Sequence, residues 1–189
     1  MRIISGSNKG KKLIMPNDKT TRPLRDMAKE SIFNILTHAK YINFHIKDCK
    51  VLDLFSGIGS FGLECISRGS KFVFFLENYA PVLKILKINI SNLNYENKSK
   101  VMEIDAFKIN NNTFEDNQKF QIIFCDPPYK EKKIELLIEK IIEIDVLERN
   151  GIIIIHRKKG DIDTYPKKFK VVDTKNYGLS TFVFGRKSN

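Results

Sequence analysis

The chain has 189 residues, 42% of them hydrophobic, and a formal net charge of +11. This composition supports one folded domain with a full core and excludes disordered and collagen-like chains. The apolar runs are far shorter than the roughly 20 residues that span a bilayer. Since the first residues also lack the apolar core of a secretion signal, we expect a cytoplasmic protein without a membrane partner. Three scattered cysteines, Cys49, Cys65 and Cys125, form no C-x-x-C pair, so we expect neither a disulfide framework nor a bound metal.

The excess positive charge lies at the two ends of the chain. Residues 1–50 carry 11 basic and 4 acidic side chains, and residues 156–189 carry 9 and 3, whereas residues 51–155 carry 13 and 15. A neutral centre with basic ends indicates a catalytic or ligand-binding core with a surface for a polyanion such as nucleic acid. A general preference for lysine, which supplies 26 of the 33 basic residues, is the alternative explanation.

The first residues predict a small appendage. Arg2–Ile4 and Lys12–Ile14 are short apolar stretches joined by a polar, cationic turn, which is typical of a hairpin or an extended arm. Apolar residues at helical spacing predict an amphipathic helix over Asp26–Ala39, with Arg22 and Arg25 at its entrance. We therefore divide the chain into an appendage over residues 1–46 and a main domain over residues 47–189.

From Lys50 onward, apolar strands alternate with helical patterns, which is typical of βαβ units in an α/β fold. The predicted strands are Val51–Phe55, Phe72–Leu76, Val101–Ile104, Gln121–Cys125 and Ile152–His156. The predicted helices are Phe61–Ser67, Pro81–Leu93 and Lys132–Ile144. Two last strands, Lys170–Asp173 and Thr181–Gly185, are joined without a helix and should pair as an antiparallel hairpin. The expected fold is a seven-stranded, mostly parallel, doubly wound sheet closed by this hairpin.

A glycine loop follows the first strand of the main domain. Gly57, Gly59 and Gly62 stand in G-x-G-x-x-G register before a helix, and Glu77 ends the next strand 20 residues after Gly57. Such a loop lets a ligand approach the backbone, and an acid at this spacing meets the ribose of a nucleotide. Loop and acid together predict a nucleoside-cofactor site, although either alone could be an ordinary turn or a solvated strand end.

NAD and S-adenosylmethionine both use this layout. Asp53 lies just before the glycines, where a carboxylate would repel a pyrophosphate but suit a cationic amino acid moiety. This favours S-adenosylmethionine, with a structural cap of the loop as the alternative role for Asp53.

The segment Asp126-Pro127-Pro128-Tyr129 follows the strand Gln121–Cys125. Two prolines hold the backbone rigid and lack N–H groups, so their carbonyls should point outward as acceptors beside a ring that can stack on a base. The Asp126 side chain and the Pro127 carbonyl could then hold the two hydrogens of an exocyclic amine for direct attack on a methyl group. Cys125 is expected to pack inside the strand and not to act as a nucleophile.

These motifs resemble the RsmD-type bacterial 16S ribosomal RNA guanine-N2 methyltransferases, which have a Rossmann-like class I methyltransferase fold. The resemblance covers nearly the whole chain and is most specific in the segment RPLRDMAKESIFNIL, from Arg22 to Leu36. It implies S-adenosylmethionine as cofactor and 16S rRNA or the assembling small ribosomal subunit as partner. We expect the chain to act as a monomer.

The resemblance also implies roles for individual residues. The cofactor would contact Asp53, Phe55, Gly57, Gly59, Glu77, Asp105 and Ala106. The target guanine would contact Asp126, Pro127 and Tyr129. The RNA would contact Lys9, Lys11, Lys12, Arg22 and Arg25, whose other possible role is a solvated surface. For His156, a structural role and a place near the site both stay open.

Three other functions are considered. A DNA adenine-N6 methyltransferase would share the Asp-Pro-Pro-Tyr motif but usually carries a further target-recognition region. An NAD-dependent oxidoreductase would explain the glycine loop and leave Asp126–Tyr129 unexplained. A nucleic-acid-binding module that has lost catalysis is disfavoured by the intact Asp53 and Glu77.

Overall fold

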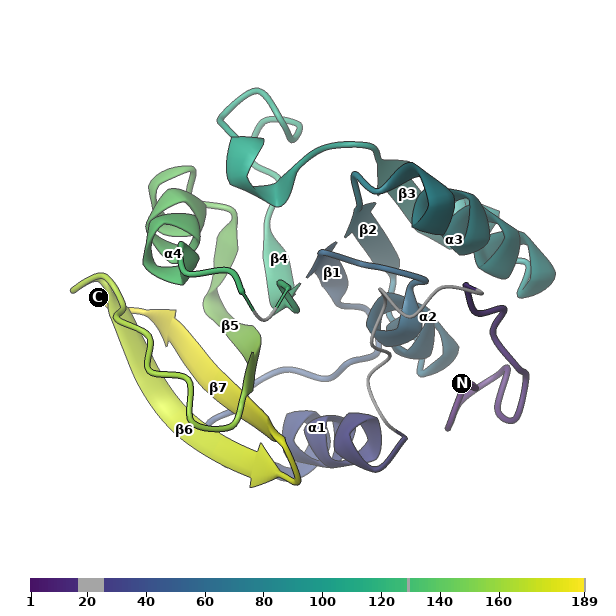
Figure 1. The fold of residues 1–189 in the computed structure, drawn as a ribbon, viewed down its shortest axis with the longest axis horizontal. Coiled ribbons are helices and arrows are strands. Elements are labelled where there is room, and N and C mark those ends of the chain that lie inside the picture. The colour runs from purple at the N-terminus through teal and green to yellow at the C-terminus, as the bar shows by residue number, and fades with distance from the viewer. Residues whose placement is uncertain (17–25, 129, 189) are drawn as a thin grey trace.

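The computed structural model describes residues 1–16, 26–128 and 130–188. Seven strands form one sheet in the order β3-β2-β1-β4-β5-β7-β6, and strands β1 to β5 pair in parallel while β7 is antiparallel to both neighbours (Figure 1). The strands are β1 (Lys50–Leu54), β2 (Phe72–Leu76), β3 (Ser99–Met102), β4 (Phe120–Cys125), β5 (Leu147–Lys158), β6 (Phe169–Tyr177) and β7 (Ser180–Lys187). The predicted mixed sheet with a C-terminal antiparallel pair is confirmed.

The helices cover the two faces of this sheet unequally. The α-helices are α1 (Asp26–His38), α2 (Ser60–Ser67), α3 (Ala80–Asn92) and α4 (Ile134–Glu143), and short 3-10 helices are η1 (Glu96–Lys98) and η2 (Ala106–Lys108). Buried residues of α1, α2 and α3 belong to one core cluster, and those of α4 belong to a second cluster on the other face. Across the described ranges, no helix is long and apolar enough to cross a membrane.

The strands are apolar throughout because both faces of the sheet are covered. Within β1, Val51 contributes to the cluster of α1, α2 and α3, whereas Leu52 and Leu54 contribute to that of α4. This alternation is the two-residue period of a strand, applied to a sheet that is buried on both sides.

The C-terminal hairpin is longer than predicted. Strands β6 and β7 are joined by a two-residue turn, in which Gly178 has φ +58°, and not by the seven residues that separate the two predicted strands. Residues 174–177 are mostly exposed on the edge strand β6. They therefore lack the run of apolar residues from which a strand was predicted. Similarly, β3 begins two residues before the predicted strand and ends at Met102, because Asp105 then caps η2.

The N-terminal residues form a hairpin with a single antiparallel bridge between Arg2 and Lys12. Ile3 and Leu13 are buried, and they share a core cluster with Phe33 of α1 and with the face of the sheet that α2 covers. Figure 1 shows these purple residues beside α2 and α3, far from the yellow β6–β7 hairpin. Residues 1–16 are therefore packed along the main domain over much of their length.

Candidate active site at the carboxyl edge of the sheet

The predicted site residues follow the carboxyl ends of neighbouring strands. Strand β1 lies between β2 and β4, and Leu54 pairs with both Leu76 and Cys125. The residues that come next, Phe55, Glu77 and Asp126, therefore leave the sheet at one edge. The strand order reverses between β1 and β4, and open α/β sheets bind ligands in the crevice at such a switch point.

The glycine loop is tied to the strands on either side. The Ser56 hydroxyl lies 2.6 Å from the Asp53 carbonyl oxygen and 3.0 Å from that of Leu76, and the Ser56 N–H also donates to Leu76. Gly59 caps α2 with φ +85°, a conformation that favours glycine. A methyl group at Gly62 would come within 2.3 Å of the Phe75 ring, so this glycine lets α2 pack directly on β2.

Glu77 lies against the glycine loop, as its spacing predicted. The Gly57 N–H donates to Glu77 Oε2 at 2.8 Å, and the N–H groups of Asn78 and Tyr79 donate to Oε1 at 2.9 and 2.8 Å. A carboxylate offers about four acceptor positions, so these three bonds leave capacity for a ligand hydroxyl. The structure thus brings Gly57 and Glu77 into direct contact.

Asp53 is a buried carboxylate beneath the loop. Asp53 is only 1% exposed, and its Oδ2 atom accepts a hydrogen bond of 2.9 Å from the Gly62 N–H. Burial raises the pKa of Asp53 well above its ordinary range; the nearby Asp126 and Glu77 add to the rise, and the Gly62 N–H opposes it. A carboxylate in this position gains from a cationic partner, which would offset the cost of its ionisation.

Phe55 directly follows β1, and Asp105 and Ala106 stand at the start of η2. Phe55 has φ +59°, which is uncommon for a bulky residue, and its ring lies 5.7 Å from that of Phe107. Asp105 caps η2 by accepting the Phe107 N–H at 2.9 Å, and Ala106 is buried. These residues provide apolar surface beside a partly exposed carboxylate, which suits a base attached to a ribose.

The Asp126-Pro127-Pro128 segment turns away from the end of β4. The Asp126 side chain is 24% exposed, Pro127 is buried and Pro128 is exposed. The Pro128 carbonyl accepts the Glu131 N–H at 2.8 Å, so part of its acceptor capacity is used within the turn. No hydrogen bond to the Pro127 carbonyl comes from residues 1–16, 26–128 or 130–188. Tyr129 lies outside the described residues.

Two residues hold this segment: His156, for which the sequence left a place near the site open, and Arg157, which sequence reasoning missed. His156 Nδ1 lies 2.7 Å from Asp126 Oδ1. The buried Arg157 donates through Nη2 to the Glu131 carbonyl and through Nε to Asp163 Oδ2, both at 2.8 Å. The signal was present in the sequence, since two polar residues end an otherwise apolar run of isoleucines.

The three cysteines are buried free thiols, as predicted. Burial raises the pKa of the Cys125 thiol, and the carboxylates of Asp126 and Asp53 raise it further. A thiol in this state is a poor nucleophile.

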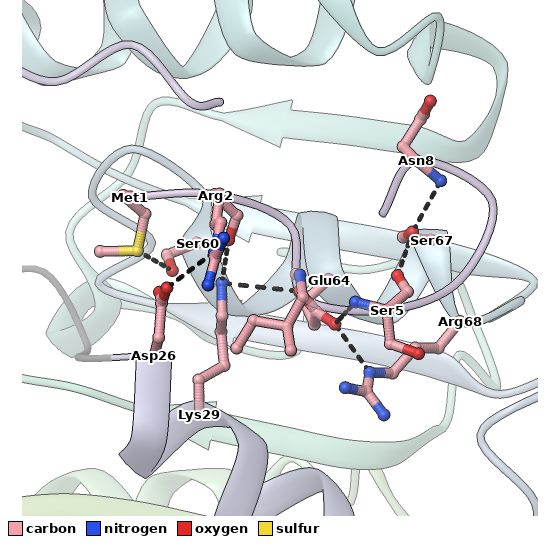
Figure 2. Close-up of polar contacts among 12 residues, drawn as sticks. Met1, Arg2, Ser5, Asn8, Asp26, Lys29, Ser60, Glu64, Ser67 and Arg68 are labelled. Carbon is pink, nitrogen blue, oxygen red and sulfur yellow. Dashed lines mark hydrogen bonds and ion pairs between the residues drawn. The ribbon is translucent and has the colours of Figure 1, made fainter. Parts of the chain in front are cut away.

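The N-terminal hairpin lies along α2 (Figure 2). Its tip contacts the C-terminal end of this helix, where the Ser7 N–H donates to the Ser67 carbonyl at 2.8 Å and the Asn8 N–H donates to Ser67 Oγ at 3.1 Å. Lys9, Lys11 and Lys12 are exposed. The glycine loop is at the other end of α2, which has eight residues and is about 12 Å long. The structure therefore does not place the tip of the hairpin at the carboxyl edge of the sheet, and Arg22 and Arg25 lie outside the described residues.

Glu64 of α2 holds the hairpin in place (Figure 2). Its carboxylate accepts the N–H groups of Ile4 and Ser5 at 2.7 and 2.9 Å and Arg68 Nε at 2.8 Å. Lys29 of α1 lies 3.5 Å from Glu64 Oε2 and donates to the Arg2 carbonyl at 2.7 Å. The Lys29 and Glu64 side chains are fully buried. We call Lys29, Glu64 and Arg68 the Glu64 cluster; it joins the hairpin and α1 to the helix that begins at the glycine loop.

A second link joins the hairpin to the loop itself. The buried Asn89 of α3 accepts the Ile14 N–H at 2.8 Å through Oδ1 and donates through Nδ2 to the carbonyls of Ile14 and Ile58 at 3.1 and 3.2 Å. Ile58 lies between Gly57 and Gly59. The end of the hairpin is therefore fixed relative to the glycine loop through one side chain.

Comparison with known proteins gives consistent matches over the full length. The sequence matches the family described as "Conserved hypothetical protein 95" over residues 1–186. YlbH of Bacillus subtilis, named as a candidate rRNA methyltransferase, is 32% identical over 99% of both chains. "Ribosomal RNA small subunit methyltransferase D" of Haemophilus influenzae is 32% identical over 96% of this chain and 91% of that protein.

Solved structures share the fold. The Escherichia coli protein yhhF superposes with a TM-score of 0.82 at 24% identity, covering 100% of this chain and 99% of that one. A candidate methylase from Haemophilus influenzae superposes with a TM-score of 0.77 at 28% identity, covering 100% of this chain and 98% of that one.

Proposed function

Because the chain belongs to the RsmD/YlbH-type methyltransferase family, with the class I methyltransferase fold, we propose that it methylates the exocyclic N2 amine of a guanine in 16S rRNA. S-adenosylmethionine would be the methyl donor. The Haemophilus relative is named for methylation of small-subunit ribosomal RNA, and this supports the choice of substrate.

The residues at the carboxyl edge fit S-adenosylmethionine. The buried carboxylate of Asp53 suits the cationic methionine part, and Glu77, at the loop, suits the ribose hydroxyls. Phe55 and Ala106 offer apolar surface for the adenine. A methyl group added at Gly57 would meet no atom within 4 Å, so the outer face of the loop is open to a ligand. When bound, this cofactor supplies an electrophilic methyl group on a sulfonium centre.

The proposal depends chiefly on one observation: Asp126 follows Cys125, which pairs with Leu54 at the start of the glycine loop. The proposed amine acceptor and the proposed cofactor loop therefore lie at the same edge of the sheet. An exocyclic amine is a weak nucleophile because its lone pair is delocalised into the ring. Asp126 Oδ2 and the Pro127 carbonyl can each accept one amine hydrogen, which localises the lone pair and directs it at the methyl group. Attack by the amine would form the N–C bond as the methyl–sulfur bond breaks, so that the sulfur leaves as a neutral thioether and the surplus amine proton is released to solvent. This displacement needs no covalent enzyme intermediate.

The test is transfer of labelled methyl from S-adenosylmethionine to small ribosomal subunits and to naked 16S rRNA, both lacking the modification. We expect N2-methylguanosine on nucleoside analysis, with the better substrate identifying the stage of assembly. N6-methyladenosine as product, or transfer to DNA in preference to RNA, would contradict the proposed substrate.

Asp126→Ala serves as the paired variant in this assay. We expect it to lose about a thousandfold or more in turnover, because the amine is no longer held, while cofactor affinity changes little. Calorimetric titration with S-adenosylmethionine checks the second point. Unchanged turnover would remove Asp126 from the proposed amine site.

A further inference from the structure

His156 lies directly behind Asp126 at the carboxyl edge of the sheet. The β4–β5 register pairs Cys125 with Ile155, so the next residue of each strand, Asp126 and His156, are neighbours. His156 Nδ1 is 2.7 Å from Asp126 Oδ1, and His156 Nε2 is 2.8 Å from Ser180 Oγ at the start of β7. The imidazole stacks on Phe182 with ring centroids 4.5 Å apart and planes 16° from parallel. These contacts come from the residue that follows β4 and from β7, and they fix the position and the plane of the ring.

We propose that His156 is a positioning residue that orients the Asp126 carboxylate for the target amine. An ionised carboxylate can only accept hydrogen bonds, so Nδ1 carries a proton and donates a hydrogen bond to Asp126 Oδ1. In the neutral ring, Nε2 then presents a lone pair and accepts a hydrogen bond from the Ser180 hydroxyl. This inference rests on the proposed function, in which Asp126 holds an amine hydrogen.

The hydrogen bond matters because Asp126 is partly exposed. With 24% of its side chain accessible, water competes with the protein for its two oxygens, and the carboxylate can rotate. The His156 side chain is only 6% exposed, so its donor is held in a fixed direction. With Oδ1 held by His156, Oδ2 is the oxygen available to the substrate. A misplacement of about 1 Å at a reacting centre can cost about a hundredfold in rate.

Two substitutions test the Nδ1–H donor and the stacked ring of His156 independently. His156→Asn keeps an amide N–H near the position of Nδ1 but loses the stacked ring. His156→Phe keeps a stacked ring of similar size and loses the donor. We expect His156→Phe to lower kcat by about 30- to 100-fold, with KM for RNA and Kd for S-adenosylmethionine within about twofold of wild type. We expect His156→Asn to restore kcat to within about fivefold of wild type.

A purely structural role predicts the opposite order. If the ring serves only to pack on Phe182, His156→Phe would be active and His156→Asn would be impaired, and that result would overturn the proposal. Equal loss in both variants would overturn it as well. Circular dichroism and urea unfolding of each variant identify any loss caused by misfolding.

A measurement on the wild-type chain does not depend on variants or on activity. Nitrogen-15 NMR of labelled histidine distinguishes the two neutral tautomers, and we expect the Nδ1–H form at His156. The Nε2–H form would overturn the proposal, because Nδ1 could not then donate to Asp126. If the wild-type chain methylates no RNA, the proposed function and this inference both fail. An active wild type with a fully active His156→Phe would overturn only the inference.

Discussion

A carboxyl group buried as deeply as that of Asp53 destabilises the folded chain when it is ionised. Its pKa in the folded state lies well above the ordinary value of 3.8, mainly because burial removes it from water. The folded state therefore binds this proton more tightly than the unfolded state does. The resulting penalty begins as pH rises past the ordinary pKa and is complete above the raised pKa.

We predict that Asp53→Asn stabilises the protein, since an amide keeps an acceptor for the Gly62 N–H without the buried charge. At pH 8 the gain should be about 1–3 kcal/mol in the free energy of unfolding, and it should shrink towards pH 4. Urea unfolding at both values measures it. Asp116→Asn, at an exposed position, is the control and should change stability little. Equal stability of Asp53→Asn and wild type at pH 8 would contradict a buried charge at this position.

The same variant should bind S-adenosylmethionine at least about tenfold more weakly, because the cationic part of the cofactor loses its counter-charge. A variant that is more stable but binds the cofactor more weakly would show that the Asp53 carboxylate serves cofactor binding. The loss of folding stability is then the consequence of burying a charge that a cationic ligand neutralises.

At the scale of elements, the Glu64 cluster decides how the N-terminal hairpin is attached. Burial lowers the pKa of Lys29, and the carboxylates of Glu64 and Asp26 oppose this shift. A buried ion pair contributes little net stability by itself, but removal of one partner leaves the other charge uncompensated. The cluster thus attaches the hairpin to the main domain, and each buried charge in it needs the other for compensation.

We predict that Glu64→Gln destabilises the chain by about 3–5 kcal/mol, and that Lys29→Met also destabilises it. The double variant should lose less than the sum of the two single losses by at least about 1 kcal/mol, because it buries neither charge. Urea unfolding of the four proteins gives this coupling energy. Additive losses would mean that the two side chains act independently.

The sequence predicts the local features of this structure well and the contacts between residues far apart in the chain poorly. The helices, the parallel strands and the contact of Gly57 with Glu77 follow from local periodicity and from a motif with known spacing. The Glu64 cluster does not, since Glu64 and Lys29 stand within helical segments where a charged residue normally faces water. The contact of His156 with Ser180 joins strands that only the folded sheet brings together. The roles of Arg22, Arg25 and Tyr129 stay predictions.

At the scale of the whole molecule, the cationic tip of the N-terminal hairpin and the candidate active site lie apart. The carboxylates of the site lie at one edge of the sheet, whereas the tip of the N-terminal hairpin contacts the far end of α2. A substrate that reaches both must extend about 12 Å or more along this helix. A structured RNA or a ribosomal particle can do this, and a mononucleotide cannot.

We predict that the hairpin lysines contribute phosphate contacts away from the candidate active site. Replacement of Lys9, Lys11 and Lys12 by Ala should weaken binding of 16S rRNA and reduce the slope of log K against log salt by about 2–3, since each lost contact removes about 0.7–0.9. The matched control replaces three exposed lysines of the neutral central region, Lys84, Lys87 and Lys98. Filter binding between about 50 and 200 mM salt measures both slopes. Equal changes of the salt slope in the two triple variants would contradict the prediction and indicate a diffuse lysine-rich surface. If the hairpin contacts RNA, the position of its lysines must matter as well as their charge.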